Sequence, residues 1–185
     1  MARRIDAPLH LVAHSLGGAV TLTIALANVA DTKSIATFEV SPVCFLRDRG
    51  ATYEEMLAVS DNFEAGERNA ARQIIDYWGG EGSFDAMQDA AQGYCRTTAG
   101  SNVLDWRSVK TTYINHEDLA QLNIPALVVR GGLAIPSMVA ITDALTRSLP
   151  NVHPAVVDGA SHFLITTHAD DCVRLLSIFL AEVTT

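Results

Sequence analysis

Four short apolar runs, separated by longer segments with helical spacing, form the main pattern of the chain. They lie at residues 9–13, 35–40, 126–130 and 153–157. Their alternation with helical segments is typical of a parallel sheet covered on both faces. The pattern therefore predicts an α/β fold with a mostly parallel sheet of about four strands. Pro154, in the last run, fits only an edge strand, because proline has no backbone N–H to donate.

Two helices are indicated after the third apolar run. The first covers residues 137–149, carries apolar residues at helical spacing and stops at Pro150. The second is expected to begin at a capping box formed by Thr167 and Asp170. Its buried face would carry Val173, Leu176, Phe179, Leu180 and Val183. We expect this last helix to pack on the sheet.

The segment between the second and third runs has a different character. Residues 41–123 contain several short helical patterns and many glycines, which indicates a helical lid inserted into a core formed by residues 1–40 and 124–185. The chain has 185 residues, which fits a single domain. A lid of this kind covers a pocket and excludes water from it. Its aromatic residues either line that pocket or form the lid's own core: Phe63, Tyr77, Trp78, Phe84 and Trp106.

The first apolar run leads into a turn with serine at its centre, Ala13-His14-Ser15-Leu16-Gly17. Small residues on both sides of Ser15 permit the strained dihedral angles of a nucleophile elbow, the strand-turn-helix motif that exposes a reactive serine. The amide of Leu16, at the start of the following helix, is then placed to donate to an oxyanion. The alternative is that Ser15 is only a helix N-cap, a position that favours serine in any protein.

A second motif, Gly159-Ala160-Ser161-His162, follows the fourth run. A lone histidine in a loop is more often a surface residue, but together with Ser15 this one stands where a serine nucleophile needs its base. In these two motifs, and in residues 124–131 and 149–150, the chain resembles an α/β-hydrolase. Residues 38–45 and 76–80 are similar to a lidded, single-domain branch of that superfamily.

The resemblance implies a partial α/β-hydrolase fold and a serine hydrolase that works by two-step acyl transfer. Ser15 would attack a carbonyl carbon, His162 would take its proton and later activate water, and the Leu16 amide would hold the oxyanion. An ester, a thioester or a carbon-carbon bond next to a carbonyl would all be cleaved in this way. We expect a small-molecule acyl substrate, no cofactor and no metal.

The acid that orients His162 is the difficult member of the set. Most relatives carry it a few residues after the strand at 126–130, where this chain has Ala134. Some relatives place it at the end of the preceding strand, where Glu39 stands, and this keeps the chain order of serine, acid and histidine. We therefore expect Glu39 to be the acid, the alternative being a structural carboxylate. The poorer candidates are Asp143 and Asp158.

Three residues are expected to bind the substrate: His14, Trp78 and Trp106. Adjacent residues on an elbow point apart, so His14 would line the pocket or support it rather than act as the base. His168 precedes two carboxylates at the start of the final helix. We interpret this group as a solvated face, where acids suit the helix dipole, and not as a metal site.

The resemblance also implies that early strands of the fold are missing. In relatives a second oxyanion donor comes from a loop before the elbow, and losing one donor costs about 100-fold to 1000-fold in turnover. The chain would then be a fragment of a longer enzyme, a weakly active shortened relative, or a non-catalytic binding or interaction module. The strand at residues 9–13 would have an unpaired edge, so we expect self-association through it unless residues 1–8 fold back over it.

Composition narrows the partners and the compartment. The net charge is -8 and the 13 basic residues are scattered, which argues against binding to nucleic acid or to an anionic membrane. No apolar run approaches the roughly 20 residues that span a bilayer, and no signal peptide opens the chain. Cys44, Cys95 and Cys172 lie far apart without metal-ligand spacing. Free thiols of this kind favour a cytoplasmic location.

Overall fold

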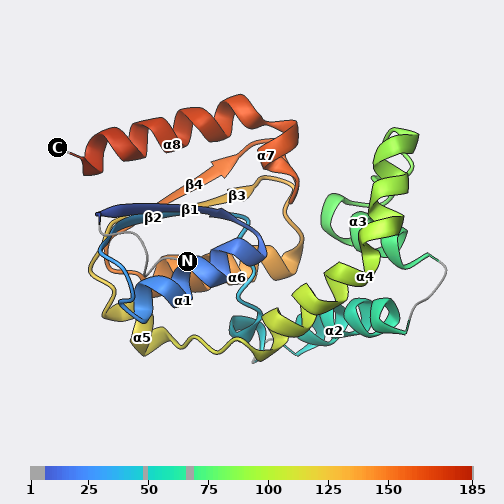
Figure 1. Ribbon diagram of the computed structural model, residues 1–185, viewed down its shortest axis with the longest axis horizontal. Helices are drawn as coiled ribbons and strands as arrows, with labels where there is room; N and C mark the ends of the chain where they lie inside the picture. The colour runs from blue at the N-terminus through green and yellow to red at the C-terminus, as the bar shows by residue number, and fades with distance from the viewer. Residues whose placement is uncertain (1–6, 48–49, 66–68, 185) are drawn as a thin grey trace.

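A single parallel sheet forms the centre of the molecule. The computed structural model describes residues 7–47, 50–65 and 69–184 (Figure 1). Within these residues the sheet has four strands in the order β1-β2-β3-β4, and every neighbouring pair is parallel. The strands are β1 (Leu9–His14), β2 (Thr32–Phe38), β3 (Ala126–Gly131) and β4 (Val152–Val157). The α/β fold expected from the four apolar runs is therefore confirmed.

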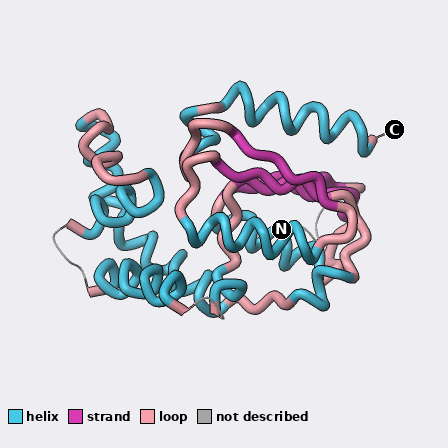
Figure 2. The backbone as a smooth tube through the Cα atoms, turned by 180° about the vertical axis from the view of Figure 1, so that it is seen from behind, coloured by secondary structure: helices cyan, strands magenta, loops and turns pink. Residues whose placement is uncertain are grey.

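Helices cover both faces of this sheet. Helices α1 (Leu16–Leu26) and α6 (Pro136–Ser148) lie against one face, and α8 (Ala169–Val183) lies against the other (Figures 1 and 2). Successive residues of a strand point to opposite faces, so each inner strand contributes to two separate cores. Ile35 belongs to the core beneath α1 and α6, whereas its neighbour Ala36 belongs to the core beneath α8. Burial on both faces explains why β2 and β3 are almost continuously apolar.

The two edge strands differ in composition. Pro154 lies in β4 opposite Val128 of β3, and β4 is the last strand of the sheet, so the edge position expected from its missing N–H is confirmed. At the other edge, β1 pairs with β2 alone among the described strands. Val12 of β1 is 49% exposed.

The segment between β2 and β3 is largely helical. Its elements are the 3-10 helix η2 (Val43–Leu46), α2 (Ala51–Glu64), α3 (Ala70–Gly79), α4 (Asp89–Thr111) and α5 (His116–Ala120). Figure 1 shows α2, α3 and α4 grouped beside the sheet, on the side toward which its strands point. The residues that follow the strands therefore lie next to these helices. None of the described helices is long and apolar enough to cross a bilayer.

Three local expectations differ from the structure. Strand β2 covers Thr32–Phe38 instead of residues 35–40, because its polar first residues pair with β1 and Glu39 already turns away with a φ of 47°. The capping box is wrong: Thr167 ends the short helix α7 (Leu164–Thr167), and α8 starts after His168 without a side-chain cap. Val173 is 61% exposed because it faces away from the sheet.

Some expectations concern parts of the chain that are not described. Residues 1–6 and the side chains of Phe63 and Trp106 lie outside the described residues. The cover of the β1 edge by residues 1–8 and the role of Trp106 in substrate binding therefore stay predictions.

Candidate active site

Ser15 occupies a sharp turn between β1 and α1. Its φ of 54° and ψ of -126° lie in a region that residues other than glycine rarely adopt. The Ser15 amide donates to the carbonyl of Phe38 at 3.0 Å, which ties the turn to the end of β2. A Cβ on Gly18 would lie 2.3 Å from Cγ2 of Val40. Helix α1 can therefore pack this closely against Val40 only with glycine at position 18. The small residues of the motif thus permit both the turn and the close packing.

The hydroxyl of Ser15 does not cap the helix. Ser15 stands at the N-cap position of α1, but its side chain makes no cap hydrogen bond. Its Oγ lies 3.0 Å from Nε2 of His162 instead. The geometry therefore favours a serine paired with a base over the N-cap alternative.

His162 lies in the loop between β4 and α7, and this loop is fixed onto the end of β3. The amide of Leu133 donates to the carbonyl of Ala160 at 2.8 Å. A Cβ on Gly131 would lie 2.2 Å from the same carbonyl oxygen, so the contact requires glycine at the end of the strand. The imidazole that this loop carries is only 4% exposed.

Glu39 lies on the opposite side of the imidazole from Ser15 and is completely buried. Its Oε2 is 3.3 Å from Nδ1 of His162, and its Oε1 accepts a hydrogen bond of 2.6 Å from the Gly131 amide. A carboxylate can only accept, so Nδ1 carries the hydrogen and Nε2 is left to accept from the Ser15 hydroxyl. This is the tautomer that a general base requires.

The other carboxylates considered from the sequence are placed differently. Asp143, on α6, and Asp158, after β4, are both exposed. Ala134 is partly buried, and its methyl side chain cannot accept a hydrogen bond. Glu39 is the carboxylate that the structure brings to His162.

The imidazole of His162 contacts three rings, and that of its chain neighbour Phe163 lies edge-on with centroids 5.9 Å apart. The indole of Trp78, from α3, stacks on it with 4.5 Å between ring centroids and 25° between planes. The ring of His14 lies 4.8 Å away at 43° and donates from Nε2 to the backbone carbonyl of His162 at 2.8 Å. Burial is the main cause that lowers the pKa of His14, and repulsion from His162 acts in the same direction. His14 thus supports the histidine loop as a neutral ring.

The start of α1 offers a site for negative charge next to Ser15. The first amides of a helix have no acceptor within the helix, and the Leu16 amide is the first of α1. The first turn contains no acidic residue, so its partial positive charge is not neutralised there. An oxyanion formed at Ser15 would be stabilised at this helix end.

A family model described as the alpha/beta hydrolase family matches residues 1–175. The chain belongs to this family. A comparison with curated proteins finds no significant match. The family assignment therefore comes from the family model, and its fold is supported by solved structures.

Solved structures with low sequence identity share the fold of this alpha/beta hydrolase. Bromoperoxidase from Bacillus anthracis has a TM-score of 0.73 and 19% identity, over 93% of this chain and 67% of that chain. MenH from S. aureus has a TM-score of 0.74 and 16% identity, over 97% and 70%. A thermophilic esterase from Thermogutta terrifontis has a TM-score of 0.71 and 18% identity, over 96% and 66%. The chain thus spans about two thirds of the length of these structures.

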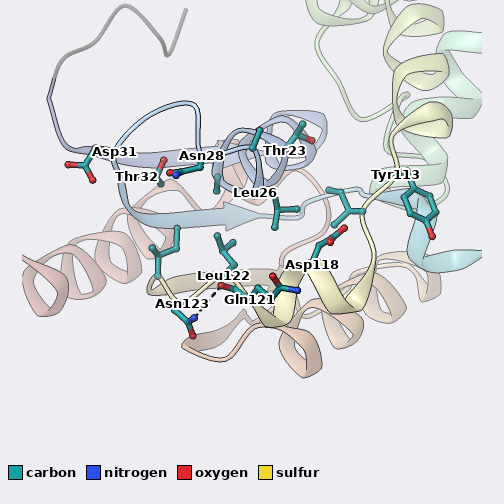
Figure 3. A pocket seen from close by; sticks show the side chains of 14 residues that line it. Thr23, Leu26, Asn28, Asp31, Thr32, Tyr113, Asp118, Gln121, Leu122 and Asn123 are labelled. Carbon is teal, nitrogen blue, oxygen red and sulfur yellow. Dashed lines mark hydrogen bonds between the residues drawn. The ribbon is translucent and has the colours of Figure 1, made fainter.

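A separate cavity of about 700 Å³ lies near the amino end of β2, at the opposite end of the strand from Glu39 (Figure 3). It is lined by the last turn of α1, the start of β2 and the residues around α5, among them Leu26, Thr32 and Asp118. Helix α1 begins next to Ser15 and ends at this cavity. The cavity therefore lies a full helix length from the Ser15 site and is not part of it. Among the described residues, no cluster of three or more His, Cys, Asp or Glu is arranged to hold a metal ion.

The sequence did not indicate two contacts in this alpha/beta hydrolase. One is the Gly131 amide on Glu39, and the other is the stacking of Trp78 on His162. The first contact could have been predicted from the sequence. Gly131 follows the predicted strand at residues 126–130, and Glu39 lies at the end of the predicted strand at residues 35–40. The second depends on how α3 packs, and no local pattern specifies that.

Proposed function

We propose that this chain is a serine hydrolase that cleaves an ester or a similar carbonyl compound, with Ser15, His162 and Glu39 as its catalytic residues. The observation that carries the proposal is the continuous line of contacts from Glu39 through His162 to Ser15. Membership of the alpha/beta hydrolase family supports it. The esterase among the structures of similar fold favours an ester as the substrate.

The proposed reaction has two steps. Ser15 Oγ attacks the carbonyl carbon of the substrate while Nε2 of His162 takes the hydroxyl proton. The carbonyl oxygen becomes an oxyanion next to the Leu16 amide, and His162 then gives its proton to the departing alcohol. Water, deprotonated by His162, attacks the acyl carbon, and His162 gives that proton to Ser15 Oγ as the acid is released. Glu39 keeps Nδ1 protonated and balances the charge of the imidazolium throughout.

Labelling with a fluorophosphonate tests the nucleophile without knowledge of the substrate. Wild type should be labelled stoichiometrically on Ser15, because the elbow exposes the hydroxyl and His162 can deprotonate it. Ser15→Ala should not be labelled, His162→Ala should react far more slowly, and the exposed Ser101→Ala is the matched control that should react like wild type. If wild type is labelled no faster than Ser15→Ala, the enzyme proposal fails and a non-catalytic binding module takes its place.

A second comparison tests the acid. Glu39→Gln keeps the size of the side chain and an oxygen for the Gly131 amide, but its amide nitrogen cannot accept a hydrogen bond from Nδ1. Turnover of an activated ester should fall by at least about 100-fold, as expected when the acid that fixes the histidine tautomer is neutralised. Asp143→Asn and Asp158→Asn are the controls. Wild-type turnover in Glu39→Gln, with a loss in either control, would move the acid to that aspartate.

A further inference from the structure

The last residues of α3 form a continuous contact with the core around His162. Tyr77 Oη lies 3.1 Å from Oγ of Ser137, a buried residue in the first turn of α6. Trp78 stacks on the His162 ring. A Cβ on Gly79 would lie 2.7 Å from the ring of Phe163, so α3 and the histidine loop are in close contact at that point. Three successive residues of α3 thus meet the core at and around the base.

The contact on each side of Trp78 fixes the position of its indole. Tyr77 is held by Ser137, and burial raises the pKa of the Tyr77 phenol, so the hydroxyl stays protonated and able to donate at neutral pH. The rings of Tyr77 and Trp78 also contact each other, with centroids 4.9 Å apart. The indole of Trp78 is therefore also supported by its neighbour Tyr77, independently of its contact with His162.

The hydrogen bonds of His162 do not by themselves fix the orientation of its imidazole ring. Its Nδ1 is 3.3 Å from Glu39, longer than the roughly 2.7–2.9 Å of a strong charge-assisted hydrogen bond. The second hydrogen bond of the ring, between Nε2 and the Ser15 hydroxyl at 3.0 Å, lies in the same plane, so the two bonds together restrain a tilt of the imidazole weakly. A stacked indole restrains that plane directly, because tilting the ring would open a gap between the two faces. Small displacements of a base matter, since about 1 Å can cost about 100-fold in rate.

We propose that Trp78 is a positioning residue that holds the imidazole of His162 in line with Ser15, rather than a wall of the substrate pocket. The proposal rests on the serine hydrolase function proposed above. It links the helical segment between β2 and β3 to the base itself. A change in the packing of α3 would then alter the rate for every acyl substrate to the same extent.

The experiment compares Trp78→Leu, Trp78→Phe and the control Tyr94→Leu, which removes an exposed aromatic side chain from α4. kcat and KM are measured with two p-nitrophenyl esters, one with a short and one with a long acyl chain. We expect Trp78→Leu to lower kcat by about 10-fold to 100-fold on both esters with little change in KM. Trp78→Phe, which keeps an aromatic face, should recover most of the rate, and Tyr94→Leu should match wild type.

Other outcomes would overturn the proposal. A loss that appears in KM and grows with acyl length would make Trp78 part of the substrate pocket, and unchanged kinetics in Trp78→Leu would remove any role. If Trp78→Leu does not fold, Gly79→Ala replaces it, because the added Cβ would collide with both Phe163 and Ser83 and so shift this end of α3. It should give the same loss on both esters, and wild-type kinetics in a folded Gly79→Ala would count against the proposal.

A readout independent of turnover separates this proposal from the proposed function. The hydrogen-bonded Nδ1 proton of His162 should give a low-field NMR signal in wild type, and this signal should broaden through exchange with water in Trp78→Leu. If wild type is not labelled by the fluorophosphonate, the serine hydrolase proposal fails. The NMR signal still decides whether Trp78 holds the ring, and an unchanged signal in Trp78→Leu would contradict it.

Discussion

At the scale of single residues, Glu39 shows how a carboxylate that follows one strand can reach a histidine that follows another. Strands β2 and β3 are parallel neighbours, so their carboxyl ends meet at one edge. Glu39 follows β2, and its carboxylate binds the amide of Gly131 at the end of β3. Its side chain therefore occupies the end of β3, beside the loop that carries His162. The lack of an acid at Ala134 does not leave the imidazole without a carboxylate.

His14 is expected to make the stability of the chain sensitive to acid. Burial holds its pKa below the usual 6.5 in the folded chain, so the unfolded chain takes up this proton first as the pH falls. The contribution of His14 to stability is complete above about pH 6.5 and is lost progressively below it. His14→Gln keeps a donor for the His162 carbonyl but does not titrate. Its free energy of unfolding should fall less than that of wild type on acidification, by up to about 1.4 kcal/mol per pH unit.

Chemical denaturation at about pH 7.5 and about pH 5.5 measures this difference. His116→Gln, which replaces an exposed ring, is the control and should keep the acid sensitivity of wild type. Equal acid sensitivity in His14→Gln and wild type would mean that His14 titrates alike in both states.

At the scale of elements, the sequence predicts the strands well and their ends less well. Strands β2 and β3 are buried on both faces, so apolar runs mark them clearly. The start of β2 escapes this rule because Ser34 is polar, yet it is buried and bonded to His10 of β1. Thr167 fits a capping pattern, but it belongs to the separate short helix α7. Local patterns find the element, and tertiary contacts decide where it ends.

The same difference applies to the candidate site. Small residues surround Ser15, where they permit a strained turn, and precede His162, where they permit a tight loop. Such local motifs can be recognised in a sequence. Trp78 is one of several aromatic residues between β2 and β3, and the sequence does not show which of them contacts the site. Phe84 shows the contrast, since it is buried and its ring contacts the guanidinium groups of Arg72 and Arg96, both in the helical segment. Only packing tells these two aromatic residues apart.

At the scale of the whole molecule, the two edges of the sheet are protected to different degrees. Strand β4 carries Pro154, which removes one donor from its edge. Strand β1 contains neither proline nor a charged lysine, the residues that commonly protect an edge. Val12 points to the face that α8 covers, as its partner Ala36 does, yet it is half exposed because α8 lies over the other strands. Among the described residues, the outer backbone edge of β1 and the side chain of Val12 are thus open.

We expect the chain to self-associate through the edge of β1. Its net charge of -8 opposes association, and salt screens that repulsion, with a Debye length of about 10 Å at about 0.1 M. Sedimentation velocity at micromolar concentration should therefore show more dimer or larger species as salt is raised. Val12→Lys places a charge on the β1 edge and should restore the monomer. Val156→Lys, on β4, is the matched control and should associate like wild type.

Amide exchange shows whether the backbone of β1 is the surface involved. The amide of Ser15 donates to β2, and successive N–H groups of a strand point to opposite sides, so the Leu11 amide faces β2 and the Val12 amide faces the open edge. If two chains pair through this edge, amide exchange at Val12 should slow as the protein concentration rises, because pairing takes its N–H group out of water, and exchange at Leu11 should not change. Val12→Lys should remove this dependence on concentration. A single monomeric species at all salt concentrations, with slow exchange at the Val12 amide, would show that the edge is already protected within one chain. Association that persists in Val12→Lys but disappears in Val156→Lys would instead locate the contact at β4.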